Sequence, residues 1–240
     1  MEALPARYVS LLERCLTRIG FSESIPAERL EIRLEGKDWP ADAETMIGLK
    51  RLDQLAACVT DVCEQGIPGD LLEAGVWRGG ACILMRGVLA ALGDETRKVW
   101  VADSFEGLPK PDSVKYPADK DDPHWTFSQL AVGIDEVREN FRRYDLLDSQ
   151  VEFLKGWFSE TLHAAPIDRL AVLRVDGDMY GSTMDVLSAL YDKVSVGGYV
   201  VVDDYGAVTS CRQAVEDFRA MRSIDSPIDW IDWTGIVWRR

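Results

Sequence analysis

Four aspartates that follow two short apolar runs are the residues of this sequence best suited to chemistry. Asp176 and Asp178 come after LAVLRV, and Asp203 and Asp204 come after GGYVVV. Like charges that a fold brings together repel and lose solvation, so they need a cation, a shared proton or open water. Carboxylate oxygens suit a hard divalent ion, of which Mg²⁺ is the one favoured here. The alternative is that Asp178 and Asp204 cap the helices that follow.

A glycine-rich turn, EAGVWRGGA at residues 73–81, is the second feature that suggests a ligand. Gly75 and Gly79 allow a tight turn and let a ligand approach the backbone N–H groups where a helix begins. The turn matches neither the dinucleotide fingerprint nor the P-loop. Asp103 ends the next apolar run, where an acid can accept hydrogen bonds from a ribose diol. A turn without a ligand and an ordinary helix cap are the alternatives.

Aromatic residues end the third apolar run, in the sequence GWFSE at residues 156–160. Trp157 or Phe158 would flank a purine there, although buried aromatic residues are more often part of a core. Together with the glycine-rich turn and Asp103, they predict a nucleoside-binding crevice at the carboxyl ends of parallel strands.

The elements that must position these residues alternate between strand and helix patterns. Five short apolar runs read as strands buried on both faces, and they are residues 70–76, 98–104, 151–157, 170–176 and 197–204. Helix patterns follow the runs at residues 79–92, 135–144, 182–194 and 210–221. The alternation predicts an α/β fold with a doubly wound, mostly parallel sheet.

Segments outside this alternation lie at both ends of the chain and in its middle. Residues 1–66 are expected to form a helical extension, with helices near 5–19 and 42–66, ahead of a core at 67–240. Residues 229–233 and 235–240 are expected to form an antiparallel hairpin at a sheet edge. The segment 107–133 contains four prolines, which forbid a regular helix, and is expected to be a lid inserted in the core.

The composition limits the class of protein. The chain has 240 residues, of which 47% are hydrophobic, and it is therefore globular. Its net charge of −14 argues against a nucleic acid partner. No apolar run reaches membrane-spanning length and no signal peptide is evident, so we expect a cytoplasmic protein with no membrane partner. The five cysteines lack a C-x-x-C pair and are expected to be reduced thiols, and the two histidines exclude a His-rich zinc site.

These motifs together resemble the macrocin O-methyltransferase (TylF-type) family. The resemblance covers roughly residues 40–240 and is carried by EAGVWRGGA, VADSFEGLP, FLKGWFSETL, LAVLRVDGDMYGSTMD, VGGYVVVDDYG and CRQAVEDFR. Members of the family are sugar O-methyltransferases of natural-product biosynthesis that depend on S-adenosylmethionine and Mg²⁺. The resemblance therefore implies a class I, Rossmann-like methyltransferase fold and a small-molecule, sugar-bearing acceptor.

Residue roles follow from the same resemblance. Asp176, Asp203 and Asp204 correspond to the metal ligands and Asp178 to the general base, which would take the proton of the reacting hydroxyl. The expected contacts to the cofactor are Met46, Glu73, Gly75, Gly79, Asp103, Ser104, Gly156, Trp157 and Phe158. His124 lies in the lid, where an exposed histidine without a role is the default. The N-terminal helices offer an interface for a homo-oligomer.

Other functions share parts of this pattern. A D-x-D pair after an apolar strand, such as residues 176–178, also marks metal-dependent nucleotide-sugar glycosyltransferases, and it resembles the haloacid-dehalogenase phosphotransferase motif. Neither accounts for the glycine-rich turn with Asp103 or for the second acidic pair. A non-catalytic module that binds S-adenosylmethionine is the third alternative, and four intact acids argue against it.

Overall fold

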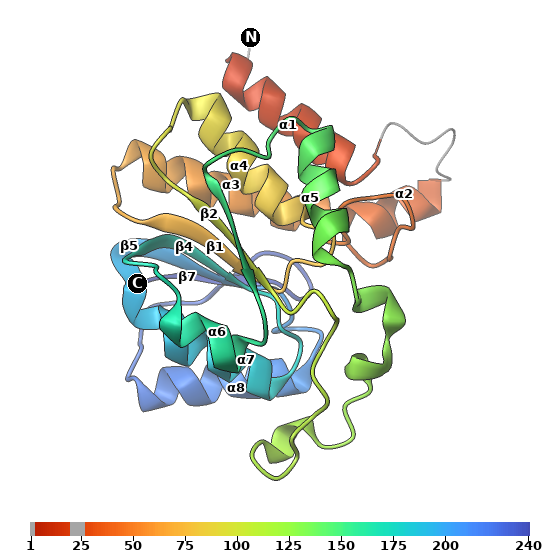
Figure 1. Ribbon diagram of the computed structural model, residues 1–240, viewed down its shortest axis with the longest axis vertical. Coiled ribbons are helices and arrows are strands. Elements are labelled where there is room, and N and C mark those ends of the chain that lie inside the picture. Colours follow the sequence, from red (N-terminus) through yellow and green to blue (C-terminus); the bar gives the residue numbers. More distant parts are fainter. Residues whose placement is uncertain (1–2, 20–26) are drawn as a thin grey trace.

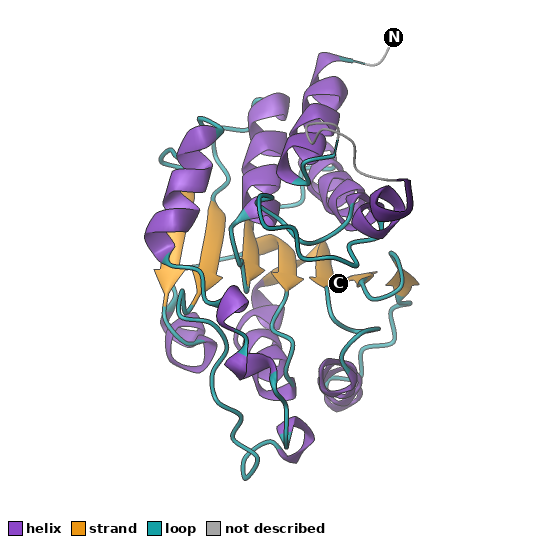
Figure 2. Cartoon of the chain, turned by 90° about the vertical axis from the view of Figure 1, so that its right-hand side faces the viewer, coloured by secondary structure: helices purple, strands orange, loops and turns teal. Residues whose placement is uncertain are grey.

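The computed structural model describes residues 3–19 and 27–240, which form three layers (Figures 1 and 2). One sheet lies between two groups of helices. On one side pack α1 (Leu4–Leu16), α3 (Leu49–Glu64), α4 (Gly80–Leu92) and α5 (Ile134–Arg143). On the other side pack α6 (Phe158–Thr161), α7 (Tyr180–Leu190) and α8 (Thr209–Met221). The short helix α2 (Ala27–Leu34) lies beside the first group.

The sheet has seven strands in the order β3-β2-β1-β4-β5-β7-β6. Their bounds are β1 Asp70–Ala74, β2 Val99–Asp103, β3 Val151–Lys155, β4 Leu170–Val175, β5 Val194–Val202, β6 Asp229–Trp230 and β7 Ile236–Arg239. Strands β1 to β5 pair in parallel, and β7 pairs antiparallel with both β5 and β6. The predicted doubly wound sheet with an antiparallel hairpin at its edge is confirmed.

The central strands of the sheet have mostly apolar sequences because helices cover both faces of the sheet. All six residues of β4 are buried, and the one charged residue among them is Arg174. The parallel register places Glu73 of β1 and Val201 of β5 beside Arg174. In a parallel sheet, residues in register point to the same face, so this register fixes an acid next to the buried arginine.

The N-terminal residues differ from the prediction in two ways. Helix α3 begins at Leu49, not near residue 42, because Gly48 has an extended backbone and residues 43–48 run as a strap without helix. Helix α2 was not predicted. Leu52, Leu55 and Val59 of α3 are fully buried in the same cluster as strands of the sheet, so the N-terminal helices complete the core on that side.

One further helix differs from its predicted bounds, whereas the 107–133 segment agrees with the prediction. The helix expected at residues 182–194 begins at Tyr180 and ends at Leu190, and residues 191–193 form a short 3₁₀ turn before β5. The segment 107–133 contains only the 3₁₀ turns Pro117–Asp119, His124–Thr126 and Ser128–Leu130, as its prolines predict.

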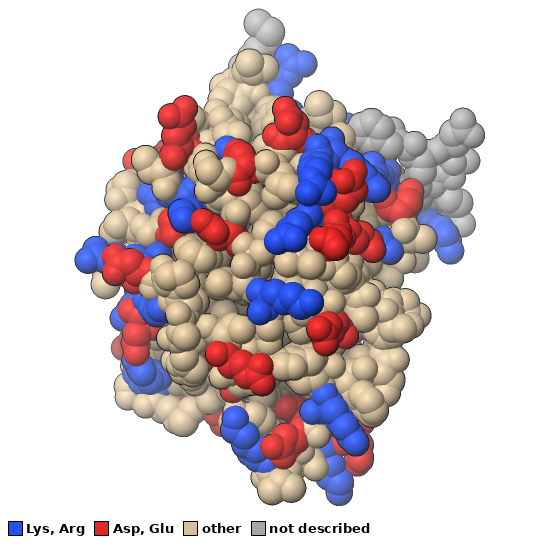
Figure 3. All heavy atoms as spheres, in the orientation of Figure 1, with Lys and Arg blue, Asp and Glu red and all other residues tan. Residues whose placement is uncertain are grey.

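Two surface properties bear on partners. Among the described residues, no helix is both long and apolar enough to cross a membrane. On the face that Figure 3 shows, acidic and basic side chains are interspersed and form no extended basic area.

Candidate active site

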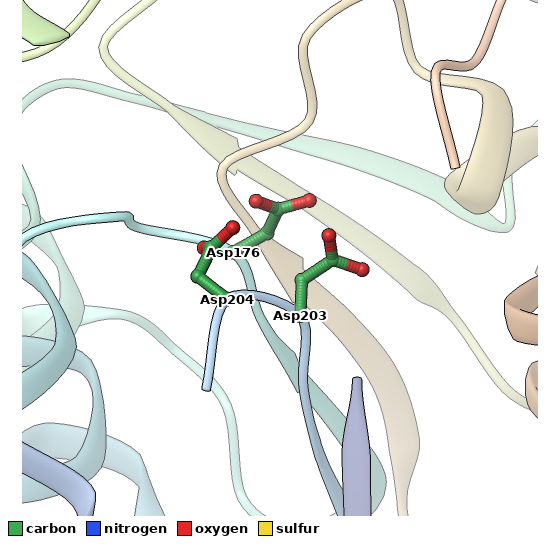
Figure 4. A group of neighbouring side chains, drawn as sticks. All are labelled: Asp176, Asp203 and Asp204. Atoms are coloured by element: carbon green, nitrogen blue, oxygen red, sulfur yellow. The ribbon is translucent and has the colours of Figure 1, made fainter. Parts of the chain in front are cut away.

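Three of the four aspartates come together where two neighbouring strands end. Asp176 follows β4, and Asp203 and Asp204 follow β5, which is paired with β4. One carboxylate oxygen from each residue lies within 4.8 Å of the others (Figure 4). The structure therefore brings together the three residues that the sequence singled out as metal ligands. Their oxygen donor set suits Mg²⁺.

A buried arginine sits directly beneath this cluster. Arg174 is 1% exposed, and its guanidinium contacts the carboxylates of Glu73, Asp176 and Asp203, with 2.7 Å to Asp176. An isolated buried ion is costly, so the arginine and the three acids stabilise one another only as a set. Part of the repulsion among the acids is thus relieved by a cation of the chain itself.

A second arginine reaches the same cluster from α3. Arg51 is 5% exposed and its guanidinium contacts Asp203. It also donates to Asp232 at 2.9 Å and to the carbonyl of Gly36 at 3.1 Å. Asp203 therefore accepts from Arg174 at one oxygen and from Arg51 at the other. Because a carboxylate has about four lone-pair sites, both oxygens keep room for a further partner.

Negative charge remains in excess after these pairings. Burial, and then the neighbouring carboxylates, raise the pKa of Asp176 and of Asp178 above the ordinary aspartate value. The same causes raise the pKa of Asp204 well above that value. The two guanidinium groups contact the carboxylates of Glu73, Asp176, Asp203 and Asp232, and Asp178 and Asp204 bring the number of neighbouring carboxylates to six. A divalent cation would lower the remaining repulsion.

Asp178 differs from the other three aspartates in its backbone and in its partners. Its φ is 54°, in the left-handed region that Asp tolerates better than most residues. Its backbone N–H donates to Asp204 at 3.1 Å. Its carboxylate accepts no hydrogen bond from the described residues, and it lines the cavity beside the cluster. Asp178 therefore presents a carboxylate of raised pKa, which suits a general base.

The glycine-rich turn brings the end of β1 against the end of β4. Gly75 has a φ of 89°, and a Cβ there would lie 1.7 Å from the carbonyl oxygen of Asp176. Only glycine permits this approach. Gly79 also has a positive φ, but it does not line the cavity, and a Cβ there would meet Val137 of α5 at 2.7 Å. Gly79 thus serves the start of α4 and its packing.

Asp103 joins this turn to the end of β2. Its carboxylate accepts the N–H of Val76 at 2.8 Å and the N–H of Phe105 at 2.7 Å. Ser104, the next residue, donates its hydroxyl to the carbonyl of Gly107 at 2.7 Å. Burial raises the pKa of Asp103, and the backbone N–H groups oppose that shift. Asp103 lines the cavity with a carboxylate that two backbone N–H groups hold in place.

One cavity of about 470 Å³ connects these groups. That volume is within the range of small-ligand sites. The predicted site residues that line it are Met46, Glu73, Gly75, Asp103, Ser104, Gly156, Trp157, Phe158, Asp176, Asp178, Asp203 and Asp204. Glu73 lines it with a carboxylate already held by Arg174 and by the thiol of Cys82, at 2.9 Å.

The strap at residues 43–48 carries Met46 into the cavity. Arg78 of the glycine-rich turn donates to the carbonyl oxygens of Pro40, Ala41 and Ala43 at 2.9–3.1 Å. The N–H of Gly80 donates to the carbonyl of Glu44 at 3.0 Å. The turn thus fixes the strap over the start of α4.

Aromatic side chains from distant segments lie on the cavity wall next to solvent. Trp39 is 50% exposed and Trp233 is 42% exposed, and both line the cavity. Trp39 packs edge-on against Phe127 of the 107–133 segment, with ring centroids 6.0 Å apart. Trp233 is fixed by a hydrogen bond from its indole to the carbonyl of Glu35 at 2.8 Å. These rings give that part of the cavity a partly apolar surface.

Sequence reasoning missed several of these residues. The sequence did contain an indication for Arg174, since this residue is the one charge in an apolar strand. Arg51 and Asp232 had none, because they lie 181 positions apart and meet only in the fold. Trp39 and Trp233 likewise gave no local indication that they share a cavity.

Comparison with known proteins decides the family. The profile of macrocin O-methyltransferase (TylF) matches residues 10–240. The chain belongs to the macrocin O-methyltransferase family. It is therefore an O-methyltransferase, and the family implies S-adenosylmethionine as the methyl donor. Membership confirms the resemblance read from the motifs and sets aside the glycosyltransferase, phosphotransferase and non-catalytic alternatives.

Named relatives of this family member are O-methyltransferases, and the name of one of them specifies a rhamnosyl-bearing substrate. The chain is 55% identical to demethyldecarbamoylnovobiocin O-methyltransferase of Streptomyces niveus, over 93% of this chain and 86% of the relative. It is 48% identical to 8-demethyl-8-(2,3-dimethoxy-alpha-L-rhamnosyl)-tetracenomycin-C 4'-O-methyltransferase of Streptomyces olivaceus, over 97% and 92%. The structure of the O-methyltransferase NovP has a TM-score of 0.94 and 52% identity, over 98% of this chain and 99% of that one. The class I methyltransferase fold is thereby confirmed.

Proposed function

We propose that this macrocin O-methyltransferase family member methylates a sugar hydroxyl of a glycosylated natural product in antibiotic biosynthesis, with Mg²⁺ as a second cofactor. The observation that carries the proposal is the meeting of Asp176, Asp203 and Asp204 beside Asp178 in one cavity with the glycine-rich turn. The names of the relatives support a sugar acceptor.

The cofactor would occupy the half of the cavity at the ends of β1, β2 and β3. There, Asp103 would accept hydrogen bonds from the ribose hydroxyls, and Trp157 or Phe158 would flank the adenine. Met46 on the strap would lie near the methionine end of the cofactor. When bound, S-adenosylmethionine supplies an electrophilic methyl group on a positively charged sulfur.

The metal would be held by Asp176, Asp203 and Asp204. Their oxygen donors and the surplus of negative charge both favour a divalent cation of the Mg²⁺ type. Bound Mg²⁺ would supply a Lewis acid that lowers the pKa of a sugar hydroxyl and orients it. Arg51 and Arg174 would hold Asp203 and Asp176 in place in the absence of the ion, so the site is already organised.

Asp178 would remove the proton of the reacting hydroxyl. Its carboxylate faces the cavity without a hydrogen bond from the described residues, and its raised pKa brings it closer to neutral pH. A base of that kind contributes about a hundredfold to ten-thousandfold to the rate. Most of the remaining acceleration would come from alignment of hydroxyl and methyl donor within one cavity.

The charge of the cavity favours a glycoside with an apolar aglycone over a nucleotide-sugar. Both arginines that line the cavity, Arg51 and Arg174, are held by carboxylates, so neither is free for a diphosphate. Acidic residues surround them. Trp39 and Trp233, by contrast, offer exposed aromatic faces that an apolar aglycone can cover.

The test is methyl transfer to matched acceptors. Purified protein with S-adenosylmethionine and Mg²⁺ is offered a glycosylated aromatic compound, its sugar-free aglycone and the corresponding nucleotide-sugar, and products are followed by mass spectrometry. Methylation of the glycoside alone, abolished by a chelator and restored by Mg²⁺, is expected. Methylation of the aglycone at an equal rate would refute the sugar acceptor. Full turnover in chelator would refute the metal.

A further inference from the structure

The segment 107–133 is attached to α7 by a buried aspartate. Asp119 lies in the 3₁₀ turn Pro117–Asp119 and is 2% exposed, although Lys120 beside it is exposed. In Figure 1 this yellow-green segment runs from the end of β2 past the sheet toward the side of α7 and α8. A buried carboxylate needs hydrogen-bond donors, and its donors come from α7.

Asp119 caps α7 from a distant part of the chain. The N–H of Tyr180 donates to Oδ1 of Asp119 at 2.7 Å, and the N–H of Gly181 donates to Oδ2 at 2.8 Å. The first N–H groups of a helix lack partners within the helix. Met179, the residue before α7, makes no side-chain cap. Asp119, a residue of the 107–133 segment, therefore supplies the N-terminal cap of α7 that the residue before the helix does not supply.

The surface of α7 is shaped for this contact. A Cβ on Gly181 would lie 2.6 Å from the ring of Tyr116 and 3.2 Å from Oδ2 of Asp119. Tyr116 also donates its hydroxyl to Asp185 at 3.1 Å, and its ring lies 5.7 Å from that of Tyr180. Glycine at position 181 is what lets the segment approach so closely.

The capped turn adjoins the proposed base. Asp178 is two residues before Tyr180, in a tight turn where the N–H of Met179 donates to the carbonyl of Gly177 at 2.5 Å. At the other end of the contact, His124 and Leu130 of the same segment line the cavity. One pair of hydrogen bonds therefore connects the backbone that carries Asp178 to the segment that forms part of the cavity wall.

We infer that Asp119 is a positioning residue that clamps the 107–133 segment onto the first turn of α7 and thereby holds Asp178 in its reactive place. The role of Asp178 rests on the proposed function, but the clamp itself does not. Asp119 does not touch the reacting atoms. It acts through the backbone of residues 177–181.

The first test measures the clamp without activity. In Asp119→Ala, the amides of Tyr180 and Gly181 should exchange hydrogen about five- to thirtyfold faster than in the wild type, since the loss of a cap typically has this effect. Protease should also cut the 107–133 segment faster. Asp112→Ala is the matched control, because the Asp112 side chain accepts two N–H groups within the same segment, from Val114 and Lys115, and has no hydrogen bond to α7 among the described residues.

The second test measures the consequence for the base. Asp119→Ala should lower kcat by about tenfold to a hundredfold, as small displacements of a catalytic group do. Its affinity for S-adenosylhomocysteine should stay within about twofold of the wild type, because the cofactor half is separate. Asp119→Asn, which keeps one acceptor, should recover part of kcat.

A double-mutant cycle completes the design. Gly181→Ala disrupts the same contact from the side of α7, so the combination with Asp119→Ala should cost little more than either change alone. Additive effects would overturn the inference. So would unchanged exchange and cleavage in Asp119→Ala, or faster exchange with an unchanged kcat. If the protein methylates no glycoside, exchange and cleavage still decide whether the clamp exists.

Discussion

Replacement of Arg174 by methionine tests the charge balance of the site most directly. The guanidinium of Arg174 contacts Glu73, Asp176 and Asp203 in a position that is 1% exposed. Methionine replaces the apolar stem of the arginine side chain, but it carries no charge and lacks the guanidinium group. The change therefore leaves three carboxylates at a buried site without their shared cation.

The expected loss of stability is large. Removal of one partner of a buried ion pair costs about 3–5 kcal/mol, because the other charge stays buried and uncompensated. For a domain of this size, 1 kcal/mol corresponds to about 2–4 °C in Tm. Arg174→Met should therefore lower Tm by about 6–20 °C. Uptake of protons by the acids keeps the loss within this range, since burial already raises the pKa of Glu73 to about 7.

The assay is thermal unfolding in metal-free buffer at neutral pH, with two comparisons. Arg169→Met is the matched control, because Arg169 directly precedes β4 and its side chain is 62% exposed. Its Tm should stay close to the wild-type value. Arg174→Met combined with Glu73→Gln should recover part of the loss, since one of the unpaired charges is then removed.

Two results would refute the reasoning. A fall in Tm no greater than that of Arg169→Met would mean that the acids do not depend on Arg174. A stabilisation by Mg²⁺ that is smaller in Arg174→Met than in the wild type would also contradict it, because a divalent ion at the cluster should matter more once only Arg51 remains as an internal cation.

Other predictions concern the cofactor, the base and pH. Asp103→Asn should weaken S-adenosylhomocysteine binding by about 1.5–3 kcal/mol in calorimetry, and unchanged affinity would remove Asp103 from the site. Asp178→Asn should lower turnover about a hundredfold to ten-thousandfold with Mg²⁺ affinity retained, whereas Asp204→Asn should lose Mg²⁺ affinity first. The opposite pattern in Mg²⁺ titrations would make Asp178 a ligand. Burial in α1 and the nearby charge of Asp53 raise the pKa of Glu13 to about 8. The folded state therefore holds its proton more tightly than the unfolded state, and that stability is present below about pH 4.3 and is lost as pH rises through 8. Glu13→Gln should accordingly raise Tm by a few degrees at pH 8.5 and by less at pH 5.5, and an equal change at both values would contradict the shift.

Local patterns in the sequence were enough for most of the fold. The central strands β1, β2 and β4 are mostly apolar because helices cover both faces of the sheet, and the sequence shows that burial directly. The predicted start of α3 is too early, because the buried strap at residues 43–48 contains good helix formers such as Ala43, Glu44 and Met46. Helix α2 has eight residues, too few for its period to stand out against the loops around it.

Some contacts in the site can also be predicted from the sequence, and others cannot. The meeting of Asp176 with Asp203 and Asp204 follows from sequence alone, because parallel neighbouring strands must end at one edge of the sheet. The spacing of residues within a motif gives no information on contacts between segments that lie far apart in the sequence. The contact of Arg51 with Asp203, which joins α3 to the end of β5, is of that kind.

The sequence by itself determined the order of the strands and helices of the core, the family and the acids that converge on the cavity. These depend on periodicity, turn residues and motifs that lie within short stretches of chain. Only the tertiary structure decided which cations face those acids, that Gly79 supports packing and does not line the cavity, and that Asp119 caps α7 across 61 positions. The physical reason is that burial favours particular residue types at each position. The pairing of buried charges, by contrast, depends on distances that exist only after the chain has folded.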